Sequence, residues 1–328
     1  MQTIINEQHE GTLEPLEIII SHNQNVNTPE DIAAHAMQSK LQELLGQQGT
    51  VKVYADYQMG SAREQIEAMQ LGRIHITIQS ASIAASFVDD MKVFLLPYLF
   101  SSNIDEVKMI LDSSLEKEAL ERIDIAENTT VSGLGLWFGG YKLFTFHGED
   151  YKNIHSPADF QGLQIAVPDN ALLEAQYQHW GAETVIMDSA ALYSTLAQRI
   201  ADGSEATVSQ IVGNYLYEVQ HNIVQAYHSP EIYVVLADTA WFTSLPLEIQ
   251  TAVLEAEQYG KEKLYAALAA QEPIYLETIS QTKGMRYDVL DDKEQEAFRT
   301  SVQTLYVEQL AGSAWQIEYV ERVKEYFK

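Results

Sequence analysis

The chain contains no cysteine among its 328 residues. This absence excludes disulfide bonds, thiolate metal sites and a cysteine nucleophile. Basic residues are also scarce, because 20 lysines and arginines face 47 aspartates and glutamates, which gives a formal net charge of -27. Such an acidic surface repels phosphate backbones and anionic headgroups, so we expect no nucleic acid among the partners.

Long apolar runs are missing as well. No segment approaches the roughly 18 to 20 apolar residues that span a bilayer. The start, Met1 to Leu16, lacks the basic and then apolar pattern of a signal peptide. Either a signal peptide has been removed or none existed, and the polar stretch Asn6 to Gly11 favours a mature, exported terminus that was given a new Met. These features leave the compartment undecided.

The motifs of common enzymes and metal proteins are not found. The nine histidines form no His-Glu-x-x-His pattern, and no Gly-x-Ser-x-Gly elbow is present. Gly133-Leu134-Gly135 resembles a phosphate loop only superficially, because no Gly-Lys-Ser/Thr follows it. No nucleophile, base and oxyanion arrangement can be assembled from these motifs. We expect no enzymatic activity, no cofactor and no metal site.

The first third alternates between strand and helix patterns. Leu16 to Ile20 alternates as a strand, and Thr28-Pro29 then supplies a helix cap and a first-turn proline. Further strands are predicted at 51–55 and 74–78, with a capped helix starting at Ser61 between them. This order predicts a parallel sheet whose ligands lie beyond the carboxyl ends of its strands, near Asn23 to Asn27 and Gln79 to Ser82.

Later segments predict a second unit and connections between the two. The strand 131–146 contains Gly139 and Gly140, where we expect a hinge. A second α/β unit begins at Ser156, and the chain returns to the first near His228. The pattern from Pro246 to about Thr282 is helical, with Pro273 inside it, and at 1.5 Å per residue it extends roughly 50 Å, longer than one lobe.

These patterns predict an α/β fold of two lobes. A chain of 328 residues with 46% apolar residues is long enough to build two cores. Each lobe is a sheet flanked by helices, and a long helix spans both, as in a periplasmic-binding-protein-like clamp. We expect lobe I to contain residues 1–139 and 228–262, and lobe II to contain 140–227 and 263–328.

The chain resembles the solute-binding proteins of tripartite ATP-independent periplasmic (TRAP) transporters, of the DctP type, from about Leu16 to Tyr319. No single marker is specific, but their order and spacing together are. The markers are Gln58-Met59-Gly60 with Arg63, Leu71-Gly72, Leu96-Pro97-Tyr98-Leu99-Phe100, Trp137 with Gly140, Val167-Pro168, Tyr193 with Leu196, Asp202-Gly203 with Glu205, Tyr217-Glu218-Val219-Gln220, His228, and Trp241 before Leu245-Pro246.

The resemblance implies a monomeric clamp that closes on a small organic solute and delivers it to the membrane subunits of a TRAP transporter. An extracytoplasmic sensor or adaptor with the same fold is the alternative. The sequence does not separate these two roles.

Three positions depart from the family pattern. Where the family places a carboxylate-binding arginine, this chain has Ala166, and Ala191 and Ala206 replace a usual glutamate and asparagine. Lys142 keeps a positive charge at a second family position but lacks the planar fork of arginine. With Asp169 nearby, we expect the ligand to be a zwitterion, an amine or a polyol instead of a simple dicarboxylate.

Several candidates also have a purely structural explanation. Lys142 could be an ordinary lysine at a strand edge, Asp169 could belong to a turn, and Glu205 could stabilise a turn. Trp137 could be a packing residue, and His228 could form hydrogen bonds in the hinge. The residues expected to contact ligand are Lys142, Gln79, Glu205, Ala166, Asp169, Ala206, Trp137, Gln210, Asn23 and His228.

Overall fold

The computed structural model describes residues 16–127, 129–148 and 154–327. The polar stretch Asn6 to Gly11, on which the expectation about the start of the chain rests, lies outside these residues. None of the helices in the described ranges is long and apolar enough to cross a membrane.

The first unit has the predicted strand and helix order. It contains β1 (Leu16–His22), α1 (Pro29–Leu45), β2 (Gly49–Tyr54), α2 (Ala62–Gln70) and β3 (Ile76–Ser80). Strand β1 pairs in parallel with both β2 and β3, which confirms the predicted parallel arrangement. The Thr28 side chain caps α1, and Ser61 and Glu64 form the predicted capping box of α2.

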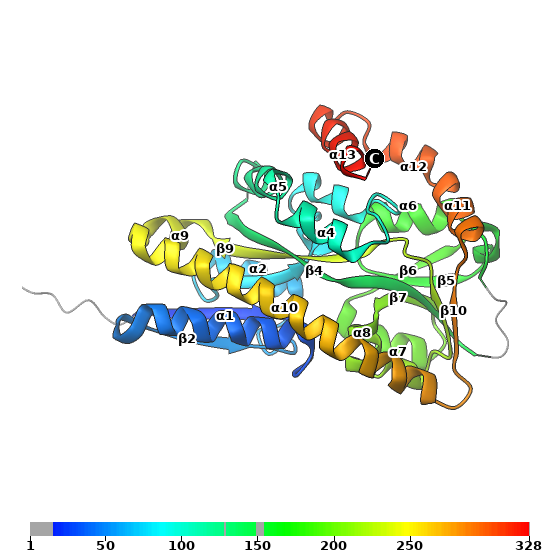
Figure 1. Cartoon of the computed structure of the whole chain (residues 1–328), viewed down its shortest axis with the longest axis horizontal. Helices are drawn as coiled ribbons and strands as arrows, with labels where there is room; N and C mark the ends of the chain where they lie inside the picture. The colour runs from blue at the N-terminus through cyan, green and yellow to red at the C-terminus, as the bar shows by residue number, and fades with distance from the viewer. Residues whose placement is uncertain (1–15, 128, 149–153, 328) are drawn as a thin grey trace, which may run out of the picture.

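Two long strands connect the halves of the molecule. Strand β4 (Val131–Phe146) pairs antiparallel with β9 (Pro230–Asp238) along its first part, and β9 also pairs with β3. The last five residues of β4 pair instead with β7 (Gly203–Thr207), and β8 (Asn222–Gln225) pairs with the end of β4. Strand β4 therefore belongs to both sheets (Figure 1).

The second unit is built on the end of β4. Strand β5 (Gln164–Val167) lies between β6 (Glu183–Ile186) and β7 and is parallel to both. Strand β10 (Arg286–Val289) pairs in parallel with β8. The helices α6 (Ala171–His179), α7 (Leu192–Ala197) and α8 (Val208–Gly213) connect or flank these strands.

Helix α10 runs from Leu247 to Gln281 without interruption, and Pro273 lies inside it. This confirms the predicted long helix. Its first part packs along α1, and its later part contacts α8, so it reaches both halves of the molecule (Figure 1). The remaining helices are α3 (Ala81–Ala84), α4 (Ile104–Leu111), α5 (Ser114–Asp124), α9 (Thr239–Ser244), α11 (Asp292–Ser301), α12 (Gln303–Gln309) and α13 (Ala314–Tyr326).

The C-terminal helices cross from one half to the other. Helix α12 packs on α6, but α13 packs on the 3-10 segment Asp89–Leu95. Gln316 Nε2 donates to Asp89 Oδ2 at 2.9 Å, and Trp315 Nε1 donates to Glu118 Oε1 at 2.9 Å. We propose that the chain passes between the lobes at 139/140 and 227/228, as predicted from the sequence. We assign α13 to lobe I instead of lobe II because of these contacts.

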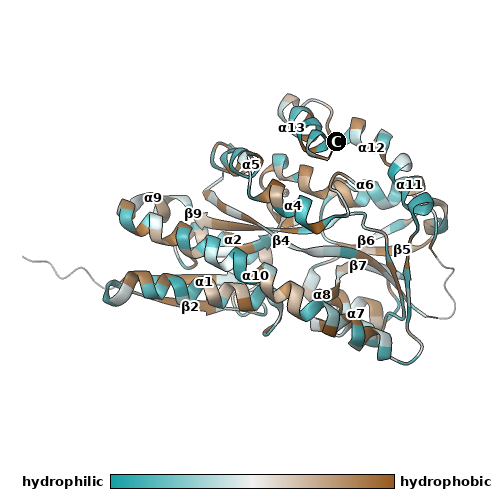
Figure 2. Ribbon diagram, viewed as in Figure 1, coloured by the Kyte–Doolittle hydropathy of each residue, from teal (hydrophilic) through white to brown (hydrophobic). Residues whose placement is uncertain are grey.

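The hydrophobic core continues across the two lobes. One large cluster contains the inner residues of β1, β3, β4 and β9 together with Phe144, Phe160 and Tyr177 of the second unit. A smaller cluster lies on the other face of the second sheet, around Leu143, Ala206 and Ile223. Teal and brown alternate along surface helices such as α1 and α5 in Figure 2, as expected for helices that bury one face.

Candidate functional site

A cleft of about 820 Å³ lies between the two lobes. Its wall is formed by the ends of β1, β3 and β9 on one side and by β5, β7 and the residues after β5 on the other. These strand ends are where an open α/β sheet binds its ligands. The polar and charged residues of the wall include Asn23, Tyr57, Arg63, Gln79, Ser80, Ser82, Asp89, Lys92, Lys142, Asp169, Asn170, Asp188, Ser204, Glu205, Gln210, Asn214 and Glu231.

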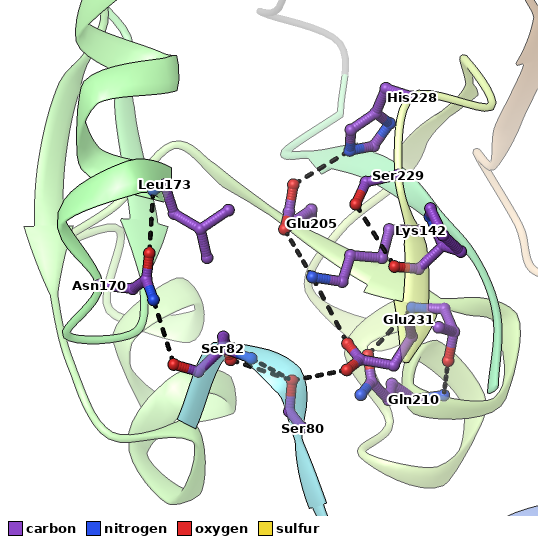
Figure 3. Close-up of polar contacts among 12 residues, drawn as sticks. Ser80, Ser82, Lys142, Asn170, Leu173, Glu205, Gln210, His228, Ser229 and Glu231 are labelled. Carbon is purple, nitrogen blue, oxygen red and sulfur yellow. Dashed lines mark hydrogen bonds and ion pairs between the residues drawn. The ribbon is translucent and has the colours of Figure 1, made fainter. Parts of the chain in front are cut away.

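Lys142 lies between two carboxylates in this wall (Figure 3). Its Nζ atom is 3.0 Å from Glu205 Oε1 and 3.5 Å from Glu231 Oε2. Strands β4 and β7 place Lys142 and Glu205 on neighbouring strands, and Glu231 enters from the start of β9. The side chains of all three residues are only 5 to 6% exposed, so the lysine already has its counter-ions within the protein.

The second oxygen of Glu205 is also fully engaged. Tyr177 Oη donates to Glu205 Oε2 at 2.7 Å, and His228 Nε2 lies 3.0 Å from the same atom. Burial lowers the pKa of His228 and outweighs the attraction of Glu205, so the ring is neutral at pH 7 and donates its Nε2 proton. Burial raises the pKa of Glu205, but Lys142 and the donated hydrogen bonds hold the net pKa well below its usual value.

The cluster carries more negative than positive charge. Burial alone lowers the pKa of Lys142, but Glu205 and Glu231 outweigh burial and raise it. One ammonium group and two carboxylates, with His228 neutral, leave a net charge of -1. Among the residues that the structure describes, no group of three or more His, Asp or Glu side chains could hold a metal ion.

A chain of amides leads from lobe I to the cleft. Gln65 Nε2 donates to the Gly60 carbonyl at 2.9 Å and also to Asn23 Oδ1. Gln65 Oε1 in turn accepts from Gln79 Nε2 at 3.0 Å. Gln79 Nε2 also donates to Thr77 Oγ1 at 2.7 Å. This chain fixes the orientation of the Gln79 amide at the end of β3.

Contacts between the lobes cross the cleft and its base. Asn170 Nδ2 donates to the Ser82 carbonyl at 3.1 Å (Figure 3), while Asn170 Oδ1 caps α6. At the base, Ser209 Oγ donates to Glu30 Oε2 at 2.9 Å. Burial raises the pKa of Glu30 to about 7 despite this hydrogen bond. The structure therefore shows the two lobes in contact on both sides of the strand crossing.

Glycines at the strand crossing permit its geometry. Gly140 has φ 102°, a conformation that residues with a Cβ atom rarely adopt. A Cβ atom on Gly139 would lie 2.4 Å from Tyr233 Cε2, so the strand passes directly over that ring.

Seven of the residues predicted from the sequence line the cleft together. These are Asn23, Gln79, Lys142, Ala166, Asp169, Glu205 and Gln210. Ligand contact at these positions stays a prediction.

Three predicted residues do not line the cleft. Trp137 is fully buried in the core and donates from Nε1 to Glu257 Oε1 at 2.7 Å. Ala206 faces the smaller core cluster, and His228 lies behind Glu205. Ligand contact at these three positions stays a prediction, and we propose that Trp137 and Ala206 pack in the core while His228 orients Glu205.

Several wall residues were not identified from the sequence, and Glu231 is the most important of them. It follows Pro230 at the start of an otherwise apolar strand, and this isolated acid is the one signal that could have indicated it. Asn170 gave no such signal, because its contact with the Ser82 carbonyl joins residues that are distant in the sequence.

Comparison with protein families gives a match over most of the chain. The model of "Bacterial extracellular solute-binding protein, family 7" matches residues 20–312. The C4-dicarboxylate-binding periplasmic protein DctP of Vibrio cholerae is 28% identical over 240 residues, which are 72% of this chain and 70% of that protein. The ectoine-binding periplasmic protein TeaA of Halomonas elongata is 24% identical over 301 residues, 92% of this chain and 82% of that protein.

Solved structures with the same fold include two TRAP periplasmic solute-binding proteins. One from Shewanella oneidensis, with bound succinate, has a TM-score of 0.86 at 24% identity and covers 96% of this chain and 100% of that one. One from Anaerococcus prevotii, with bound D-glucuronate, has a TM-score of 0.87 at 22% identity, covering 94% and 97% respectively. These likenesses confirm the predicted two-lobed α/β fold.

Proposed function

The chain belongs to family 7 of the bacterial extracellular solute-binding proteins, and we propose that the solute it captures is held in the cleft between Gln79, Lys142 and Glu231. The observation that carries this proposal is the burial of charged and amide side chains from both lobes in one cavity wall. A ligand in this cavity contacts both lobes at once, so its binding energy favours the closed arrangement.

We propose that the captured solute is delivered to the membrane subunits of a TRAP transporter, from a periplasmic location. The relatives support the importer over the sensor, because DctP of Vibrio cholerae is a C4-dicarboxylate-binding periplasmic protein and the Shewanella oneidensis structure is a TRAP periplasmic solute-binding protein. The hinge we propose lies at Gly139 and Gly140 and near His228, where the strands pass between lobes.

The solute class that we propose is a zwitterion, an amine or a polyol. Ala166 offers no donor at the position where the family places an arginine, and Lys142 is committed to Glu205 and Glu231. A simple dicarboxylate entering this cleft meets the carboxylates of the wall, Glu205 and Glu231 among them, and no unpaired cation among the described wall residues. The related proteins named above bind solutes of more than one class, since one is an ectoine-binding protein.

We propose that the solute leaves chemically unaltered. His228, which contacts the wall residue Glu205, is fully buried and uses Nε2 to hold that carboxylate, so it is not placed to act as a base on a ligand.

Native mass spectrometry of the purified protein, followed by denaturation and identification of the released small molecule, tests the function directly. We expect a stoichiometric, unmodified solute, and re-addition of that solute should raise the melting temperature and reduce the radius of gyration in small-angle scattering. Steady conversion of the solute, or an unchanged radius at saturation, would contradict the proposal.

A further inference from the structure

We propose that Gln79 and Glu231 form a binding subsite for an ammonium group that carries N–H protons. This inference rests on the proposed function, since it names the chemical group by which the captured solute is recognised. The subsite presents two hydrogen-bond acceptors to the cleft. One is the side-chain oxygen of Gln79 at the end of β3, and the other is the carboxylate of Glu231 at the start of β9.

The Gln79 side chain presents its oxygen to the cleft. The Gly60 carbonyl accepts a hydrogen bond from Gln65, so the nitrogen of Gln65 points to Gly60 and its oxygen points to Gln79. The hydrogen bonds from the Gln79 side chain to Gln65 and Thr77 then both use Nε2. No described residue donates to Gln79 Oε1, although the residue is only 3% exposed. An acceptor that lines the cleft and that no described protein group uses is available to a donor from the ligand or from water.

Glu231 retains acceptor capacity in the same wall. Its Oε1 atom accepts from Ser80 Oγ at 2.6 Å, but Oε2 has only the long 3.5 Å contact with Lys142. Each carboxylate oxygen has two acceptor positions. Ser80 directly follows Gln79 and brings Glu231 to the end of β3 (Figure 3).

The other charges of the wall favour a cationic ligand group. Each described basic side chain that lines the cleft already has an acidic partner: Arg63 pairs with Glu67, Lys92 with Asp89, and Lys142 with Glu205 and Glu231. The buried cluster itself carries a net charge of -1. A buried excess of negative charge is compensated when a cation binds next to it.

The requirement for N–H protons separates this subsite from simple charge attraction. A primary or secondary ammonium group donates to Gln79 Oε1 and Glu231 Oε2 together, whereas a quaternary ammonium group has no proton to donate. A neutral hydroxyl donates only once and brings no charge. The expected order of affinity is therefore ammonium, then trimethylammonium or hydroxyl, then carboxylate.

Two ligand series of matched chain length test this order by titration calorimetry and thermal shift. The first consists of 5-aminopentanoate, its N,N,N-trimethyl form, 5-hydroxypentanoate and glutarate. The second consists of 1,5-diaminopentane and 1,5-pentanediol, and four- and six-carbon homologues of both series allow for the length of the cleft. In each series we expect the N–H-bearing member to bind at least about 10-fold more tightly, as for a charge-assisted hydrogen bond.

Two variants test whether Glu231 and Gln79 cause the expected order of ligand affinities. Glu231→Gln keeps the shape but removes the charge, and we expect it to weaken ammonium binding at least about 10-fold while changing hydroxyl binding less than 3-fold. Gln79→Leu removes the acceptor and should reduce the preference for ammonium over trimethylammonium. The matched control is Glu183→Gln, which removes one negative charge from an exposed position of β6 outside the cleft wall.

These experiments can contradict the proposed ammonium subsite without contradicting the proposed function of solute capture. Equal or tighter binding of glutarate, failure of every ammonium member to bind, or unchanged discrimination in Glu231→Gln would overturn the subsite while solute capture stood. If Glu231→Gln does not fold, the order measured with the native protein decides alone. Failure of the function itself appears in the native mass spectrometry and scattering described above.

Discussion

The Nζ atom of Lys142 lies 3.0 Å from Oε1 of Glu205, and both side chains are buried where the last part of β4 pairs with β7. The lysine is thus held by the protein itself. Its charge stabilises two carboxylates that otherwise repel each other in a medium of low dielectric constant.

Removing the lysine should therefore destabilise the fold. We expect Lys142→Met to lower the free energy of unfolding by about 3 to 5 kcal/mol, because Glu205 and Glu231 lose their shared cation. Guanidinium denaturation measures this value. The control is Lys52→Met, which breaks an exposed pair with Glu17 and should change the free energy of unfolding far less. A loss of similar size in both variants would show that the buried cluster contributes no special stability.

Glu257 should make stability depend on pH. Burial raises its pKa to about 8, although Trp137 donates a hydrogen bond to it. Between about pH 4.5 and 8 the folded protein keeps a proton that the unfolded chain has lost, so stability decreases as the pH rises through this window. Glu257→Gln removes this effect, and its stability relative to the native protein should increase by up to about 1.4 kcal/mol per pH unit.

Denaturation of both proteins at intervals from pH 5 to pH 8 provides the measurement for Glu257. Glu255→Gln on the same helix is the control, because Glu255 is exposed and pairs with Lys40 at the surface. Parallel pH curves for the native protein and Glu257→Gln would show that the carboxyl group titrates normally.

Asn170 should act on closure and not on folding. Asn170→Asp keeps the oxygen that caps α6 but replaces the amide that donates to the Ser82 carbonyl. We expect the dissociation constant of the identified solute to rise about 3- to 10-fold, as for the loss of one hydrogen bond, with little change in the free energy of unfolding of the ligand-free protein. Asn103→Asp, at the exposed cap of α4, is the control for changing an asparagine cap. Unaltered affinity would mean that the Ser82 contact is absent from the closed state.

Restoring an arginine at position 166 should not restore carboxylate binding. Ala166 is buried beside Leu143 and Ala206, so Ala166→Arg brings a guanidinium group to a site without the acid missing at Ala191 or the amide missing at Ala206. We expect a loss of about 1 to 3 kcal/mol in stability and weak binding of mono- and dicarboxylates. Calorimetric titration with a carboxylate panel tests both proteins, with Ala166→Met as the control for added volume. Submicromolar affinity of the native protein for a plain dicarboxylate would contradict the argument.

Periodic patterns predicted the elements that depend on local rules. The strand 131–146 and the helix containing Pro273 have nearly their expected bounds, because alternation, helical spacing and caps act within one segment. The cleft position of Gln79 followed from the rule that ligands lie at the ends of parallel strands.

The acceptors of the cleft could not be predicted in the same way. The orientation of Gln79 depends on the carbonyl of Gly60 through Gln65, and the position of Glu231 depends on Ser80, which is 151 residues away in the sequence. Tertiary pairing creates these contacts, and no sequence period records them. Lys142 was expected to offer its positive charge to the ligand, because the sequence does not show that Glu205 and Glu231 pair with it.

Strand β4 carries residues of both sheets on one uninterrupted backbone, so neither lobe possesses a complete sheet of its own. If β7 and β8 detach, the last five residues of β4 lose their partners, whereas the first part of the strand still pairs with β9. We therefore expect the two lobes to unfold as one cooperative unit, in a single calorimetric transition. A fragment expressed from either lobe alone would lack a strand that its sheet requires.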